Sequence, residues 1–246
     1  LSNDGEKEYD ALNAIIFPKH PYGTQTTIGT QEHLKNPSIL NIKNYFKRYY
    51  VPNNVAICMA GDMNPDEVIA TIDKYFGDWE KSDNLSRAQY APVKNLTSAV
   101  DSTVIGLEAE NVMLGWKANK ASDLQCDTLD VINSILYNGH AGMFDLNLNQ
   151  NMKVQYAATG FENLNDYSEL LLQGGPKEGQ KLEDVRALML EQIEKLKKGE
   201  FSDDLIPSVI NNMKLRYYTS LQNNKDRADK FVDSFINGID WKDQVE

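Results

Sequence analysis

The segment NVAICMAGDMNPDE, residues 54–67, joins a short apolar run to a strongly marked helix start. Residues 54–60 are apolar and bounded by turn-forming residues, which favours a central β-strand over a helix of so few residues. Asn64 then offers a side-chain cap, Pro65 fits the first helical position, and Glu67 stands where a capping box needs a carboxylate. A strand followed directly by a helix predicts an α/β unit around this segment.

Helical periodicity precedes this segment as well. Apolar residues recur at intervals of three and four in residues 6–17, where Pro18 ends the pattern. They recur again after Ser38, a candidate N-cap, as far as Pro52. The polar, aperiodic residues 81–98 are predicted to form a linker.

The chain after this linker predicts a second unit of strands and helices. Strands are expected at residues 99–107, 111–118, 154–161 and 167–173. Helices are expected at residues 122–137, 143–149, 181–198, 204–221 and 225–237. Strands grouped before long helices predict an α+β fold, in which helices pack on a largely antiparallel sheet in two α/β units.

The composition argues against two kinds of partner. A formal charge of -11 over 246 residues, with no basic stripe to offset it, would repel a phosphate backbone, so nucleic acid is not an expected partner. No run approaches the roughly 18 consecutive apolar residues of a membrane span, so no membrane-spanning helix is expected. The first residues lack both an initiator Met and the layout of a signal peptide, so we expect a trimmed chain.

Cys58 and Cys126 are predicted to be buried, reduced thiols.

The histidines do not form a metal-binding pattern. Zinc hydrolysis needs about three protein ligands and an open position for water, normally supplied by histidine and carboxylate side chains on rigid elements. The chain has three histidines, His20, His33 and His140, and no two of them have the spacing of His-x-x-Glu-His or His-Glu-x-x-His. His33 is predicted to be a solvated loop residue and His140 a turn residue. We therefore assign no metal ligand and no catalytic residue in this chain.

Four sequence blocks, in their order and spacing, resemble the pitrilysin and insulinase family of zinc metallopeptidases, the M16 type. They are His20-Pro21-Tyr22-Gly23, Tyr50–Ile57, Gly61–Glu67 and Tyr75–Trp79. The resemblance continues more weakly from Val104 to Trp241 and so covers nearly the whole chain. The zinc-binding motif of the family, His-x-x-Glu-His, is absent from these 246 residues.

The resemblance implies a division of roles between domains. In that family two similar α/β domains form half of a clamshell, and the first domain holds zinc through the two histidines of the motif and a later glutamate. The family pattern places that glutamate shortly before Leu1. Residues 1–80 are then expected to be the C-terminal part of the first, catalytic-type domain, and residues 99–246 the start of the second, inactive domain, both incomplete. Zinc is expected in the parent protein, with none bound by this chain.

Tyr156 is the candidate substrate-binding residue that the resemblance implies. Family members place an Arg and, seven residues later, a Tyr against the substrate near the scissile carbonyl. Here Tyr156 matches the Tyr, but Asn149 replaces the Arg, and an amide lacks the forked positive charge that polarises a carbonyl. The alternative interpretation of Tyr156 is a strand aromatic that packs on a neighbour.

Two functions are compatible with these observations. The leading hypothesis is a fragment of a zinc-dependent endopeptidase acting on peptides, in which this chain forms the non-catalytic chamber wall beside an upstream zinc site and is inactive alone. The alternative is a non-catalytic M16-like scaffold or peptide-binding subunit. The expected partners are a peptide substrate, held extended as an added strand, and the remaining M16 domains of the same chain.

Overall fold

The computed structural model describes residues 3–245, which divide into two compact units. Of these residues, unit 1 contains 3–24 and 92–216, and unit 2 contains 25–91 and 217–245. Both units are therefore discontinuous in sequence. These bounds reflect packing within the chain, and the family-type domain boundaries predicted from the sequence stay a prediction.

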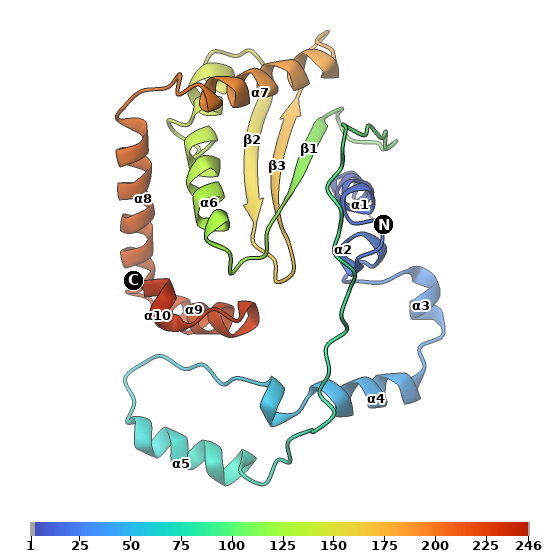
Figure 1. Ribbon diagram of the computed structural model, residues 1–246, viewed down its shortest axis with the longest axis vertical. Coiled ribbons are helices and arrows are strands. Elements are labelled where there is room, and N and C mark those ends of the chain that lie inside the picture. Colours follow the sequence, from blue (N-terminus) through green and yellow to red (C-terminus); the bar gives the residue numbers. More distant parts are fainter. Residues whose placement is uncertain (1–2, 246) are drawn as a thin grey trace. The chain divides into compact units, whose positions relative to one another are not determined.

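Unit 1 is built on a three-stranded antiparallel sheet (Figure 1). The strands β1 (Val112–Ala118) and β2 (Tyr156–Glu162) flank β3 (Ser168–Gly175), in the order β1-β3-β2. Each is rich in β-branched, aromatic or aliphatic residues that favour a pleated, half-buried surface. The antiparallel sheet and three of the predicted strands are confirmed.

Helices cover one face of this sheet (Figure 1). α6 (Leu124–Leu136) and α7 (Leu182–Lys197) pack there together with the short π-helix η2 (Asp145–Asn149). Their apolar stripes and the facing strand residues form one core, whose fully buried members include Leu136, Phe144, Leu148, Leu172, Val185 and Met189. Burial of these side chains is the main source of stability for the unit, at about 1.5–3 kcal/mol for each large apolar residue.

The opposite face of the sheet receives α1 (Asp4–Ile16), which is followed by the short helix α2 (Pro21–Thr24). Leu114 of β1 joins the core under α6 and α7, so its neighbour Gly115 points to the other face. A Cβ atom at Gly115 would lie 2.7 Å from a methyl group of Leu12. The glycine therefore allows α1 to approach the sheet closely.

Unit 2 contains helices and extended chain, and no strand occurs in its described residues. Its helices are α3 (Gln31–Lys35), α4 (Ile39–Tyr49), η1 (Pro52–Asn54), α5 (Pro65–Phe76), α9 (Asn224–Asn237) and α10 (Trp241–Val245). Along the chain, α8 (Leu205–Ser220) runs from unit 1 into unit 2. Across residues 3–245 no helix combines the length and apolarity needed to cross a membrane.

The predicted start of α5 is confirmed. Asn64 is its N-cap, and the side-chain oxygen accepts a hydrogen bond from the Asp66 N–H at 3.1 Å. The same amide donates to the Glu67 carboxylate at 3.3 Å, and Pro65 occupies the first turn. Local capping chemistry thus determines where this helix begins.

The strand predicted at residues 54–60 is wrong. A strand needs a neighbour to satisfy its backbone N–H and C=O groups, and the described residues place none beside this segment. Its alternating side chains Val55, Ile57 and Met59 are exposed. The sequence pattern is that of a buried strand, but the structure leaves it uncovered.

The strand predicted at residues 99–107 is also wrong. The end of this segment is held by a side chain instead of a strand, because the Asp4 carboxylate of α1 accepts hydrogen bonds from the N–H groups of Leu107 and Glu108. The hydrogen bond from the Lys7 ammonium group is the main cause that lowers the pKa of Asp4. The two backbone hydrogen bonds lower this pKa further. The carboxylate therefore fixes the chain in an irregular conformation before β1.

The cysteines are free thiols, as the sequence predicts. Cys126 is buried, and its sulfur lies 3.2 Å from the Lys120 carbonyl oxygen. Cys58 is only partly buried, so the expectation of burial is wrong for this residue.

Candidate functional site

Tyr156 begins β2 on the sheet face that carries α1. It is 39% exposed, and its ring lies against Gly175, the residue opposite it on β3. A Cβ atom at Gly175 would come 2.4 Å from ring atom Cε1, so the ring occupies space that only glycine leaves open. Partial burial, and secondarily the Glu8 carboxylate of α1, raise the pKa of the Tyr156 hydroxyl. The hydroxyl is therefore a neutral hydrogen-bond donor at pH 7.

Asn149, at the position where the family resemblance implies an arginine, hydrogen-bonds to the backbone of β2. Its Nδ2 donates to the Ala157 carbonyl oxygen at 2.8 Å, and the Ala157 N–H donates to its Oδ1 at 2.8 Å. An amide can do both because it carries a donor and an acceptor, whereas a guanidinium carries donors only. Asn149 therefore acts as a substitute for a neighbouring strand at this point of the sheet.

The rest of the outer edge of β2 is open. Backbone groups alternate in direction along an antiparallel strand, so Thr159 and Phe161 point their N–H and C=O groups outward, as Ala157 does. In the part of the chain that the structure describes, these outward groups have no backbone hydrogen-bond partner. An edge of this kind accepts an extended peptide as an additional strand.

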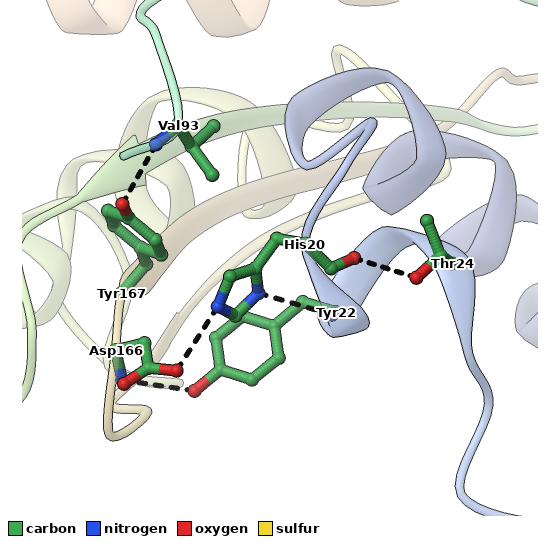
Figure 2. A network of polar contacts seen from close by, with 6 residues as sticks. All are labelled: His20, Tyr22, Thr24, Val93, Asp166 and Tyr167. Atoms are coloured by element: carbon green, nitrogen blue, oxygen red, sulfur yellow. Dashed lines mark hydrogen bonds and ion pairs between the residues drawn. The ribbon is translucent and has the colours of Figure 1, made fainter. Parts of the chain in front are cut away.

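His20 lies in a buried polar network between the end of α1 and the turn that joins β2 to β3 (Figure 2). Its Nδ1 accepts from the Tyr22 N–H at 3.3 Å, so Nε2 carries the proton and lies 3.1 Å from Asp166 Oδ2. The Asp166 N–H donates to the Tyr22 hydroxyl at 3.1 Å. Tyr167 completes the network by accepting from the Val93 N–H at 2.9 Å. Both ring nitrogens of His20 are thus engaged, which makes this histidine structural.

The other histidines are separate from this network. His33 and His140 are both exposed, and His33 belongs to α3 of unit 2. The His140 N–H donates to Asn138 in the turn after α6, as expected for a turn residue. Among residues 3–245 no group of three His, Cys, Asp or Glu side chains could hold a metal ion. The donor set of these residues therefore does not fit zinc.

A cluster of one tyrosine and two glutamates joins α1 to the sheet. The Tyr9 hydroxyl lies 2.8 Å from Glu162 Oε2 and 3.1 Å from Glu169 Oε2. The two glutamates are directly opposite each other on β2 and β3. Glu169 is fully buried, and desolvation is the main cause that raises its pKa to about 7. Desolvation likewise raises the pKa of Tyr9.

This cluster was not predicted from the sequence. The available signal was Glu169 itself, a charged residue that directly precedes the apolar run Leu170–Leu172 in a predicted strand. A charge in such a position needs a partner across the sheet or from a covering element. The partner comes from α1, about 160 residues earlier in the chain, a distance over which periodicity carries no information.

A helix-covered antiparallel sheet defines the class of the molecule as an α+β domain. The family model described as the peptidase M16 inactive domain matches residues 38–213, and the chain belongs to this family. The family resemblance is therefore confirmed.

Curated relatives carry zinc protease names. The chain is 25% identical to zinc protease PqqE of Helicobacter pylori over 223 residues, which cover 88% of this chain and 50% of that protein. It is 21% identical to the uncharacterized zinc protease YmxG of Bacillus subtilis over 225 residues, which cover 90% of this chain and 53% of that protein. The chain thus spans about half the length of these relatives.

Solved structures share the fold. A protease from Helicobacter pylori superposes with a TM-score of 0.77 at 23% identity, covering 89% of this chain and 54% of that one. The peptidase M16 inactive domain from Pseudomonas fluorescens gives a TM-score of 0.79 at 14% identity, covering 98% of this chain and 57% of that one. At these identities the likeness establishes the fold alone.

Proposed function

We propose that this chain is the non-catalytic, peptide-contacting part of a zinc-dependent endopeptidase. In this proposal zinc is held by other residues of the same polypeptide, and the described residues form the chamber wall beside it. Residues 1–80 belong to the catalytic-type domain, residues 99–246 begin the inactive domain, and the remaining M16 domains are the partners. The zinc protease names of the curated relatives support the assignment of the parent activity.

The observation that carries the proposal is the open edge of β2 next to Tyr156. An added peptide strand would gain hydrogen bonds from the outward backbone groups of Thr159 and Phe161. The outward N–H and C=O groups of Ala157 are already hydrogen-bonded to Asn149. The pairing of an added peptide would therefore end before Ala157. Tyr156, the residue before Ala157 in β2, is partly exposed, and its neutral hydroxyl is a donor that the peptide could use.

A second function, a scaffold or peptide-binding subunit without catalysis, is favoured by a different observation. The matching family model describes an inactive domain, and none of the described residues forms a metal-binding group. Both functions use the same peptide-contacting edge. They differ in whether the parent polypeptide hydrolyses what it binds.

Binding of a labelled peptide tests the proposal. We expect a fluorescein-labelled extended, apolar decapeptide to bind the chain, measured by fluorescence anisotropy. A matched peptide that is N-methylated at alternate residues, on the side that pairs with β2, should bind at least tenfold more weakly. Equal binding of the two peptides, or no binding of either, would overturn the assignment of this edge.

A further inference from the structure

The hydrogen bonds around Tyr9 require one more proton than the tyrosine supplies. Its hydroxyl has a single hydrogen, yet it lies within hydrogen-bond distance of Oε2 of both Glu162, at 2.8 Å, and Glu169, at 3.1 Å. Tyr9 donates along the shorter contact, to Glu162. The contact to Glu169 is then a hydrogen bond only if the Glu169 carboxyl is protonated and donates to the tyrosine oxygen.

The surroundings of Glu169 favour the neutral carboxyl. The residue is 0% exposed, and its Oε1 atom has no hydrogen-bond partner in the described part of the chain. Asn13, one turn after Tyr9 on α1, is also buried. Its side chain hydrogen-bonds with the Tyr9 hydroxyl, but its side-chain oxygen has no partner among residues 3–245. A buried site with a surplus of acceptors disfavours an additional negative charge.

Among residues 3–245, no ion pair joins a cation to Glu169. Lys117 is directly opposite Glu169 on β1, but its ammonium group donates to the Val93 carbonyl oxygen at 3.1 Å and lies 4.8 Å from the Tyr167 ring centroid. From β2 the facing group is Glu162, an acid. From α2 it is the Tyr22 hydroxyl, which lies in the His20 and Asp166 network of Figure 2.

We propose that Glu169 is a protonation-controlled latch that holds α1 on the sheet. With the proton present, Glu169, Tyr9 and Glu162 form a continuous chain of hydrogen bonds from β3 through α1 to β2. Without it, two carboxylates face one tyrosine hydrogen, and a buried charge is left without a cation. Loss of the proton therefore weakens the attachment of α1, independently of peptide binding at the edge of β2.

The direction of the pH effect follows from the pKa of Glu169. Burial raises this pKa from 4.5 to about 7, and the negative charge of Glu162 adds to the effect. The attached state therefore binds more protons than the detached state between pH 4.5 and 7. Attachment of α1 is strongest below pH 4.5, weakens as pH rises through this window, and stays weak above pH 7.

Amide hydrogen exchange of α1 in the 246-residue chain tests the latch. After correction for the intrinsic exchange rate, protection of residues 4–16 should fall on the order of 50-fold between pH 5 and pH 8. In Glu169→Gln the amide N–H replaces the carboxyl hydrogen as donor to Tyr9, so protection should not change with pH. The network of His20, Tyr22 and Asp166 is unaltered in this variant, so a pH dependence confined to wild type is assigned to Glu169.

A second measurement needs no variant. Carbon-13 NMR of the glutamate side-chain carboxyls should give one titration midpoint near pH 7, assigned to Glu169. A midpoint near 4.5 for this residue, or an equal pH dependence of α1 protection in wild type and Glu169→Gln, would overturn the proposal. A pH-independent wild type would overturn it as well.

Discussion

Asn149 and Ala157 are joined by two hydrogen bonds of 2.8 Å, one in each direction. Through them a side-chain amide takes the place of a neighbouring strand at one point of the β2 edge. The outward N–H and C=O groups of Thr159 and Phe161, the next such residues, have no backbone partner among residues 3–245. If a peptide pairs with this edge as proposed, Asn149 determines where the added strand has to stop.

Replacement of Asn149 by Ala should destabilise unit 1 by about 1–2 kcal/mol, because both hydrogen bonds to the β2 backbone are lost. The change can be measured by urea denaturation. Asn151→Ala is a suitable control, since Asn151 is exposed and makes one hydrogen bond, to the Leu146 carbonyl oxygen. If both variants were equally stable, the role of Asn149 as a strand substitute would be wrong.

Replacement of Gly175 by Ala should displace the Tyr156 ring, because the new methyl group would lie 2.4 Å from it. We expect a cost of about 1–3 kcal/mol and weaker binding of the labelled peptide. Gly160→Ala is the matched control, since Gly160 is in the same strand as Tyr156 and a Cβ atom there meets nothing within 4 Å. Similar losses in the two variants would contradict the account of the ring position.

Replacement of Tyr9 by Phe should weaken the attachment of α1, because the hydroxyl that links Glu162 to Glu169 is lost. At pH 5 the amide protection of residues 4–16 should fall about tenfold, which corresponds to about 1.4 kcal/mol. Unchanged protection at pH 5 would mean that the Tyr9 hydroxyl does not hold α1 on the sheet.

The chain alone should bind zinc weakly and should not hydrolyse peptides. Its histidines are scattered, and both ring nitrogens of His20 are already in hydrogen bonds. Calorimetry checks the first expectation, and cleavage of a quenched fluorescent peptide, with and without phenanthroline, checks the second. Either a stoichiometric sub-micromolar zinc site or phenanthroline-sensitive cleavage would contradict the placement of the zinc site in other residues.

The helices were predictable from sequence because their determinants are local. Asn64, Pro65 and the apolar stripe that follows them act within one or two turns, and α5 begins where they indicate. Strands depend on partners elsewhere in the chain. Residues 112–118 form β1 by pairing with β3, which lies 50 or more residues later in the chain. Residues 54–60 have a similar apolar pattern but no partner in the described structure.

The candidate site was predictable only in part, for the same reason. Tyr156 could be chosen by its match to a family motif, but its dependence on Gly175 requires the register of β2 on β3. The Glu169 cluster is assembled from α1, β2 and β3. No spacing in the sequence indicates that these three elements meet.

Residue-resolved amide exchange on the β2 edge tests the central claim most directly. We predict that addition of the extended apolar peptide protects the N–H groups of Thr159 and Phe161 and leaves that of Ala157, already bound to Asn149, unchanged. Binding of the peptide without protection of Thr159 and Phe161 would contradict the claim that this chain contacts peptides through the open edge of β2.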